Sequence, residues 1–283
     1  MNEGALSIRR MKRSEIDIGI DWAEAEGWNP GIHDADCFYA ADPDGFFIGL
    51  LKDEPAAMVS AVAYGDSYGF MGFYIVKPEF RNRNYGVLLW NEGLQHLKNR
   101  CIGLDSVRPD LVSHNKPEFK PAYTNYRFKW IKDEQSAVAP EVVDLSSVPF
   151  SIVAAYDCEV FGLSRESFLK CWINQPDSRA LGIITLDKLS GYGVIRKCRE
   201  GFKIGPLFSD SVEHAKALFE ALVSDVKMGS QIFLDTPEKN PEAVSIAQGY
   251  DMTEVFQTTR MYKGQEPALP LNKWFGVTSF ELG

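Results

Sequence analysis

The sequence predicts a mixed α/β fold built from two modules, each a mostly antiparallel sheet flanked by helices. Short β-rich apolar runs joined by tight turns precede a basic loop and an amphipathic helix in the first half of the chain. A similar order of helices and strands returns, at low similarity, in the second half. Because 283 residues suffice for two cores, we expect modules at residues 1–135 and 136–283, the second of them degenerate.

The first module is predicted to start with a strand at residues 6–10 and a helix that Ser14 caps and that ends near Glu26. A short helix follows from His33, and Asp42-Pro43-Asp44-Gly45 is a strong turn. Antiparallel strands are predicted at residues 46–51, 56–64 and 70–76. After the basic loop and its helix come a strand at 102–107, a short helix at 110–116 and a strand at 119–130.

The second module is predicted to begin after residues 137–149, which read as a linker or a lead-in strand. Asp210, with Glu213 in capping-box spacing, is expected to cap its amphipathic helix. The other predicted elements are helices at 154–161, 164–173 and 240–248 and strands at 180–186, 192–198, 202–207, 231–235 and 252–262.

The bulk composition excludes several classes of protein. The formal net charge of −9 disfavours nucleic-acid binding, which relies on clustered Lys and Arg, and is compatible with a cationic or amine-bearing substrate. No apolar run reaches membrane-spanning length and the N-terminus lacks a signal-peptide pattern, so we expect a cytoplasmic protein that binds no membrane. Five widely spaced cysteines and four scattered histidines predict reduced thiols and no metal site.

Residues 69–97 contain the strongest functional signal. An apolar strand ends at Val76, Pro78 stops it, and a helix follows the basic loop. Unpaired backbone N–H groups at a helix N-terminus attract anions, and Arg81 and Arg83 would add positive charge. The pattern indicates a phosphate cradle, although a surface loop with two solvated arginines explains it too.

The loop sequence resembles the pyrophosphate-binding signature of the GNAT superfamily of acyl-CoA N-acyltransferases, R/Q-x-x-G-x-G/A. Arg81 and Gly86 match its first and last places, while Asn84 stands where glycine is usual. Asn is the residue other than glycine that best tolerates a left-handed backbone. The predicted order β-α-α-β-β-β-α-β-α-β is also the GNAT order.

The resemblance extends over most of the chain. It includes Trp28-Asn29-Pro30-Gly31, the segment 42–47, the segment 73–76 and the aromatic segment 274–283. Together they resemble two-module GNAT proteins of the YitH type. The counterpart of the phosphate loop in the second module, residues 205–210, has no arginine, and its Asp210 would repel a pyrophosphate. We therefore expect the second module to complete the acceptor pocket or stiffen the enzyme, and residues 274–283 to add a strand or pack between the modules.

The resemblance implies acetyl-CoA as the acyl donor and no metal. Backbone groups of the strand before the loop would bind pantetheine, and loop amides would bind the pyrophosphate. The residues implied are Ile75, Val76, Arg81, Asn82, Arg83, Asn84, Tyr85 and Gly86.

The transfer needs a base for the amine, oxyanion stabilisation and an acid for the departing thiolate. His114 occupies the place where the family's acidic Tyr is expected, with Tyr123 or Tyr126 as replacements, although a surface histidine explains His114 equally well. For the base, Asp34 is the leading candidate beside His33 and Asp36; helix capping explains the two aspartates as well. Residues expected to line the acceptor pocket are Trp28, His33, Tyr64 and Tyr74.

The sequence thus predicts an acetyltransferase that moves an acetyl group to a primary amine of a small molecule by direct transfer in a ternary complex, as a monomer or homodimer. One alternative is a catalytically idle acyl-CoA sensor or scaffold. Another is a relative that transfers a different acyl group, or an aminoacyl group from tRNA, which the acidic balance disfavours.

Overall fold

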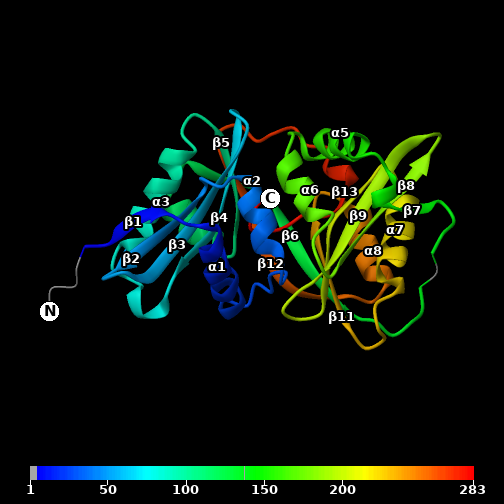
Figure 1. Ribbon diagram of the computed structural model, residues 1–283, viewed down its shortest axis with the longest axis horizontal. Helices are drawn as coiled ribbons and strands as arrows, with labels where there is room; N and C mark the ends of the chain where they lie inside the picture. Colours follow the sequence, from blue (N-terminus) through cyan, green and yellow to red (C-terminus); the bar gives the residue numbers. More distant parts are fainter. Residues whose placement is uncertain (1–4, 137) are drawn as a thin grey trace.

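The computed structural model describes residues 5–136 and 138–283. We call the half that holds β1–β6 the first module and the half that holds β7–β13 the second module (Figure 1). The elements of the first module are β1 (Ser7–Arg10), α1 (Arg13–Ala25), α2 (Asp34–Ala41), β2 (Phe46–Leu51), β3 (Glu54–Tyr64), β4 (Tyr68–Val76), the short 3₁₀ helix Pro78–Phe80, α3 (Tyr85–His96), β5 (Cys101–Ser106), α4 (Pro109–Asn115) and β6 (Phe119–Ile131).

The second module repeats the plan. Its elements are β7 (Val142–Asp144), the 3₁₀ helix Leu145–Ser147, α5 (Phe150–Phe161), α6 (Glu166–Trp172), β8 (Ser178–Thr185), β9 (Lys188–Lys197), β10 (Phe202–Ser209), α7 (Val212–Ser224), β11 (Gln231–Pro237), α8 (Pro241–Gly249), β12 (Thr253–Lys263), the 3₁₀ helix Leu271–Lys273 and β13 (Trp274–Gly276). The mixed α/β fold, with its mostly antiparallel sheet, is as predicted.

The modules exchange strands within one continuous sheet. The strand order is β1-β2-β3-β4-β5-β12-β6-β11-β10-β9-β8-β7, so β12 lies between β5 and β6, and β6 lies between β12 and β11. Both exchanged strands run through the middle of the molecule (Figure 1). Each module thus completes its sheet with a strand from the other; the predicted boundary between residues 135 and 136 stays a prediction.

Two buried ion pairs hold the exchanged strands in place. Arg127 on β6 donates two hydrogen bonds of 2.7 Å to Asp235 on β11. In the matching position, Arg260 on β12 donates two of 2.8 Å to Asp105 on β5. Burial alone raises the pKa of Asp235, but the charge and hydrogen bonds of Arg127 outweigh it and lower the pKa. Because a buried arginine without its partner is costly, these pairs fix which strands lie side by side.

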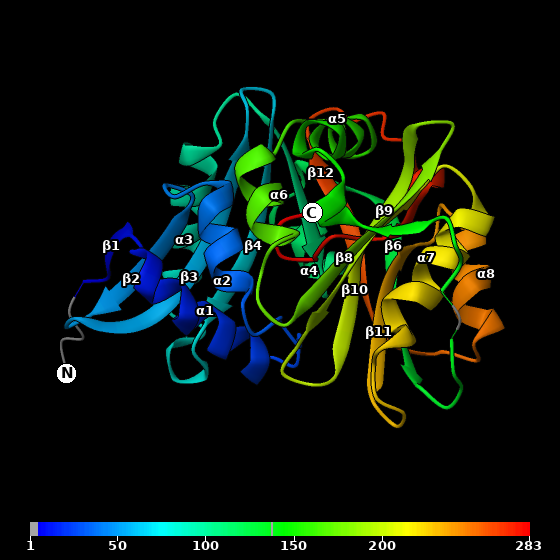
Figure 2. The same cartoon turned by 45° about the vertical axis from the view of Figure 1, so that its right-hand side comes forward.

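Helices cover both faces of the sheet. On one face, α3 packs on the first module, and α7 and α8 pack on the second. On the other face, α1 and α2 meet α5 and α6 around one apolar core that contains Phe38, Phe73 and Trp172. Both views place α6 beside α2 (Figures 1 and 2). The Sγ atoms of Cys37 and Cys171 lie 2.7 Å apart across this helix pair.

Two predicted helix caps are wrong. Helix α1 begins at Arg13 with Lys12 as its N-cap, so Ser14 lies inside the helix, and the Glu15 carboxylate accepts the Lys12 backbone N–H at 2.7 Å. Helix α7 is capped by Ser211, whose side chain accepts from the His214 backbone N–H at 3.2 Å, rather than by Asp210. In the second case the strand before the helix runs to Ser209, two residues further than predicted, and the helix cap follows at Ser211.

The segment Trp274–Gly283, which we call the final segment, is buried along its whole length. Its first residues form β13, which pairs with β10, and its later residues pack in the core shared by the two modules. This agrees with both expectations for it. No helix in the described part of the chain is long and apolar enough to span a membrane.

Candidate active site

Strands β4 and β5 diverge after a short parallel pairing. The pairing runs from Tyr68 with Cys101 to Met71 with Leu104 and then stops. On the side of β3, the register shifts by one residue between Gly72 and Ile75, so β4 contains a bulge, and Phe73 in it has a φ of 44°. Among the described residues, the stretch of β4 from Gly72 to Val76 has no partner on β5. This leaves an open edge of backbone next to the basic loop.

The basic loop is exposed and locally left-handed. Residues 81–84 are exposed. Asn84 is the N-cap of α3 with a φ of 61°, which agrees with the idea that Asn replaces glycine there, and Asn82 has a φ of 63°. The loop therefore delivers the chain to an exposed helix N-terminus, which is the geometry that suits an anion.

Arg81 and Gly86 fix the shape of the loop. The Arg81 side chain donates to the Val76 carbonyl at 2.9 Å and forms an ion pair with Glu26. At Gly86, an added Cβ would lie 2.3 Å from the Tyr74 hydroxyl oxygen. Tyr74 itself is 42% exposed and packs edge-on against Trp90. Glycine at 86 thus lets the Tyr74 ring lie against the first turn of α3.

In the described part of the second module, β10 has the same bulge, but no exposed loop follows it and β13 fills the gap that is open in the first module. Strand β10 gains an extra residue between Ile204 and Leu207, and it runs on to Ser209, two residues before the α7 cap. Residues 205–210, predicted as a loop, are therefore mostly strand. The parallel pairing of β10 with β11 ends at Ile204, and β13 fills the gap by pairing with Leu207 and Phe208. The Val277 N–H then donates to the Asp235 carbonyl of β11 at 2.7 Å.

The loop between α1 and α2 contacts both the exchanged strand β6 and the second module. The Trp28 carbonyl accepts from Arg127 at 2.7 Å, and the Asn29 carbonyl accepts from Lys203 at 2.8 Å. His33 pairs with Asp177 at 3.0 Å. Burial, and then the positive charge of Arg127, lower the pKa of the Lys203 ammonium. This loop forms a fixed contact between the modules.

Asp34 is fully buried in this contact. Its Oδ1 accepts from Arg196 at 2.9 Å and its Oδ2 accepts the Gly31 N–H at 2.8 Å. Both Nη atoms of Arg196 are buried without a hydrogen-bond partner among the described residues. The two Asp34 bonds give its carboxylate a structural role at the module boundary, and its role as a base stays a prediction.

The remaining predicted residues lie apart. Tyr64 is buried and donates from its hydroxyl to the Leu282 carbonyl at 2.9 Å, and burial raises its pKa. His114 is exposed in the last turn of α4. Tyr123 is buried on β6, whereas Tyr126 bonds to Glu238 at 3.4 Å. The structure therefore groups Ile75, Val76 and the loop in one place, and Trp28, His33 and Asp34 in another.

The final segment reaches the open edge of β4 from Gly72 to Val76, which we call the first opening. The sequence did not predict this contact. An added Cβ on Gly72 would lie 2.1 Å from the Glu281 carbonyl oxygen, so the segment touches β4 at its bulge. Glu281 is 4% exposed. The aromatic composition of this segment signalled burial, but no pattern indicated which strand it would cross.

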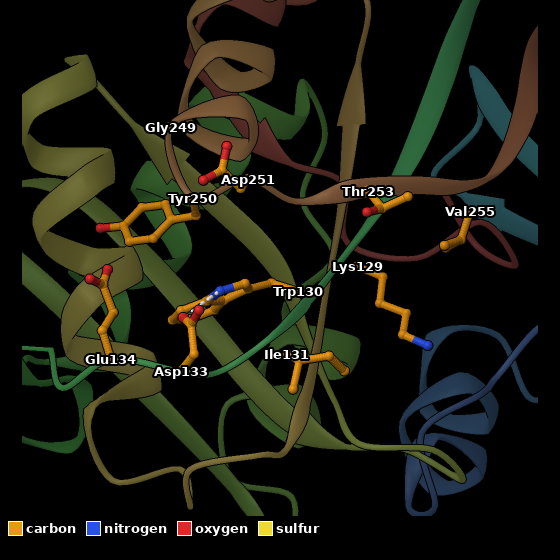
Figure 3. Close-up of a pocket in the computed structure, with 10 residues that line it drawn as sticks. All are labelled: Lys129, Trp130, Ile131, Asp133, Glu134, Gly249, Tyr250, Asp251, Thr253 and Val255. Carbon is orange, nitrogen blue, oxygen red and sulfur yellow. Dashed lines mark hydrogen bonds between the residues drawn. The ribbon is translucent and has the colours of Figure 1, made fainter.

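Two cavities lie away from the open edge of β4. One of about 550 Å³ lies between the end of β6, α8 and the start of β12, with Trp130 and Tyr250 beside Asp133, Glu134 and Asp251 (Figure 3). The other, of about 230 Å³, lies between the modules where β4 begins at Tyr68, roughly 13 Å along the strand from Gly72. Neither contains a residue of the basic loop. No cluster of His, Cys, Asp or Glu in the described ranges is arranged to hold a metal.

Comparison with known proteins gives two family matches. Residues 16–118 match the model described as "Acetyltransferase (GNAT) family", and residues 153–276 match the one described as "Acetyltransferase (GNAT) domain". The chain is 31% identical over 269 residues to a protein named holothin acyltransferase from Pseudoalteromonas sp. (strain SANK 73390), covering 95% of this chain and 92% of the relative.

Solved structures agree on the fold. A candidate acetyltransferase from Pyrococcus horikoshii superposes with a TM-score of 0.83 at 21% identity, covering 98% of this chain and 96% of its own. A tandem GNAT protein from the clavulanic acid biosynthesis pathway gives a TM-score of 0.63 at 12% identity, covering 93% and 100%. At these identities the likeness concerns the fold.

Proposed function

The chain belongs to the GNAT acetyltransferase family, with two GNAT domains in tandem, and from this premise we propose that it is an acetyl-CoA-dependent N-acetyltransferase acting on a small primary amine. The observation that carries the proposal is the open edge of β4 from Gly72 to Val76, which ends at an exposed loop before α3. The second module has no equivalent opening, so we propose one acyl-CoA site per chain.

The residues around the first opening fit acyl-CoA. Backbone groups of Ile75 and Val76 would bind the pantetheine arm, and the amides of residues 81–86 would bind the pyrophosphate. The left-handed Asn84 and the close approach at Gly86 both support this assignment. When bound, acetyl-CoA supplies an activated thioester carbonyl.

The reaction forms a carbon–nitrogen bond and breaks the carbon–sulfur bond. The neutral amine attacks the thioester carbon, backbone N–H groups at the β4 bulge stabilise the oxyanion, and the sulfur leaves with a proton. Direct attack requires donor and amine to be bound together, in a ternary complex. The amine gives up one proton and the thiolate gains one, so the reaction is balanced.

His114 stays our candidate for the acid. In His114→Ala we expect kcat to fall about 100-fold, because general acids contribute roughly 10²–10⁴-fold, while KM for acetyl-CoA stays within twofold. Asn115→Ala, a change in the same turn of α4, is the matched control. Wild-type turnover in His114→Ala would exclude it as an essential acid.

For the acceptor, we propose a site where the α1–α2 loop meets the second module. Trp28 and His33 lie there, held by Arg127, Lys203 and Asp177. A relative similar over 95% of the chain is named for acyl transfer to holothin, which supports a small-molecule acceptor. Placement in the YitH type stays a prediction.

The experiment is calorimetry with acetyl-CoA. We expect wild-type binding and at least tenfold weaker binding by the Arg81→Glu, Arg83→Glu double variant, since charge reversal would repel the pyrophosphate. Lys188→Glu with Lys216→Glu applies the same charge change to exposed positions of the second module and should bind normally. Equal affinity of all three proteins would remove the phosphate-loop assignment.

Turnover separates the alternatives. Acetylated product from any of benzylamine, tyramine or aniline supports the transferase. Tight acetyl-CoA binding without product from a broad amine panel would favour an idle acyl-CoA sensor. Faster turnover with a longer acyl-CoA would assign a different acyl group.

A further inference from the structure

The final segment crosses the first opening on the face where α1 and α2 pack. Its Glu281 carbonyl touches Gly72 on β4, and Tyr64 holds the Leu282 carbonyl at 2.9 Å. Its Phe280 ring lies 4.8 Å from the Arg127 guanidinium on β6. The segment thus bridges β4 and β6, and Glu281 lies where the strands β4 and β5 have separated.

The ion-pair pattern sets Glu281 apart from the other buried carboxylates. Asp34, Asp105, Asp157 and Asp235 each accept a hydrogen bond from the Nε of a buried arginine. Glu281 is 4% exposed, and within the described residues its carboxylate has neither a hydrogen bond nor an ion pair. Burying a carboxylate without a hydrogen-bond partner costs folding free energy, so its presence needs an explanation, and a catalytic role would supply one.

The charges around Glu281 come from the second module and from β6. Arg127 on β6, Arg196 on β9 and Lys203 on β10 all interact electrostatically with it. Arg127 and Arg196 are bound to Asp235 and Asp34 respectively, and the Lys203 ammonium donates to backbone carbonyls, so none of the three forms an ion pair with Glu281 among the described residues. Cys198 belongs to the same cluster of titratable groups as Asp34, Asp235 and Lys203, and burial raises its pKa.

We propose that Glu281 is the general base that accepts the proton of the acceptor amine. The inference rests on the proposed function and adds a residue to it. The carbon–nitrogen bond forms as the amine proton passes to a Glu281 oxygen, the carbon–sulfur bond breaks, and the thiolate is protonated by the separate acid. The second module then contributes to catalysis through the segment it sends across the first opening.

The test compares Glu281→Gln with wild type, using acetyl-CoA with aniline and with benzylamine. Amide product is quantified by chromatography from pH 5 to 9. We expect kcat to fall about 100-fold or more, with calorimetric affinity for acetyl-CoA and KM for acetyl-CoA within twofold. Because aniline stays largely neutral across this range, the loss of kcat with aniline should appear at every pH. Glu266→Gln makes the same substitution at an exposed position and is the control, which should behave as wild type.

Each outcome decides the role of Glu281. A variant with wild-type kcat would overturn it. A lower melting temperature with kcat within threefold of wild type would make Glu281 a structural charge instead. If Glu281→Gln does not fold, Glu281→Asp decides: the shorter side chain keeps the charge, so we expect a normal melting temperature with kcat at least tenfold lower, and wild-type kcat would contradict the proposal. No turnover by the wild type with any amine of a broad panel would overturn the proposed function, and the base with it.

Discussion

In each module two neighbouring parallel strands separate, and the modules differ in what occupies the gap between them. In the first, β4 leaves β5 after Met71 and its edge stays free beside an exposed loop. In the second, β10 leaves β11 after Ile204, and β13 occupies the gap. Both strands carry a bulge at the same place. The fold therefore separates the strands in both modules, and in the second module β13 fills the gap, which we call the second opening. We propose that this strand excludes a ligand there.

The segment that closes the second opening also reaches the first. After β13 it passes Gly205, where an added Cβ would lie 2.4 Å from the Val277 carbonyl oxygen, and continues to Gly72. Glycines on both bulged strands thus admit the same stretch of backbone. One piece of chain thus fills the second opening and lies against the bulge of β4 in the first module.

The largest effect is expected from emptying the second opening. Trp274 is fully buried, stacks on Phe161 and donates from Nε1 to the Val160 carbonyl at 2.9 Å. Trp274→Ala should cost about 3–5 kcal/mol of unfolding free energy, measured by chemical denaturation. Leu186→Ala, at a site 91% exposed, should cost under about 0.5 kcal/mol. A loss below about 1 kcal/mol for Trp274→Ala would show that β13 does not hold the second opening shut.

The exchanged strands should be equally important to both modules. Asp105→Asn and Asp235→Asn each leave a buried arginine without its charge partner, so each should cost about 3–5 kcal/mol of unfolding free energy. Asp66→Asn removes an exposed carboxylate 3.8 Å from Arg100 and is the control. If only one of the two buried substitutions were costly, the exchange would stabilise one module rather than both.

The contribution of the ionised Asp235 side chain to the free energy of unfolding should decrease at low pH. Because Arg127 lowers the pKa of Asp235 in the folded state, the stability from its ionised form is present above about pH 4 and is lost as the pH falls below that value. The difference in unfolding free energy between wild type and Asp235→Asn should therefore shrink at low pH. A difference that grows on acidification would mean that the folded state raises the pKa instead.

Smaller effects are expected from substitutions at the N-termini of α7 and α3. Ser211→Ala removes the α7 cap and should cost about 1 kcal/mol of stability without changing affinity for acetyl-CoA. At the start of α3, Asn84→Gly keeps a residue that accepts a φ of 61° and should retain affinity, whereas the β-branched Asn84→Val should weaken it. Calorimetry on the three variants checks this, and equal binding by Asn84→Val would mean that the left-handed turn is unimportant.

The local sequence pattern predicted the helices and strands but not the topology of the sheet. Hydrophobic periodicity located nearly every strand and helix, and the loop at Arg81–Gly86 was found from its charge and its neighbours. The exchange of β6 and β12 was missed because both read as ordinary last strands, and pairing between distant segments leaves no local signal. Charged residues within apolar strands, Arg127 and Asp235 among them, were the available hint of buried pairs.

Only the part of the candidate site whose residues are neighbours along the chain could be predicted. Ile75, Val76 and the loop are neighbours along the chain, so one motif identified them together. Glu281 lies more than 200 residues away from the strand it touches, and its position depends on how the final segment passes through both modules. Asp34 was chosen from its place in the chain, and its pairing with Arg196 could not be inferred without the second module.

The most direct test of the difference between the two openings is amide hydrogen exchange with and without acetyl-CoA. We predict that acetyl-CoA protects amides in residues 72–88, which contain the open edge of β4 and the loop, and leaves residues 205–212 and 274–277 unchanged. Protection at residues 205–212, or none at residues 72–88, would contradict the assignment of the single acyl-CoA site to the first module.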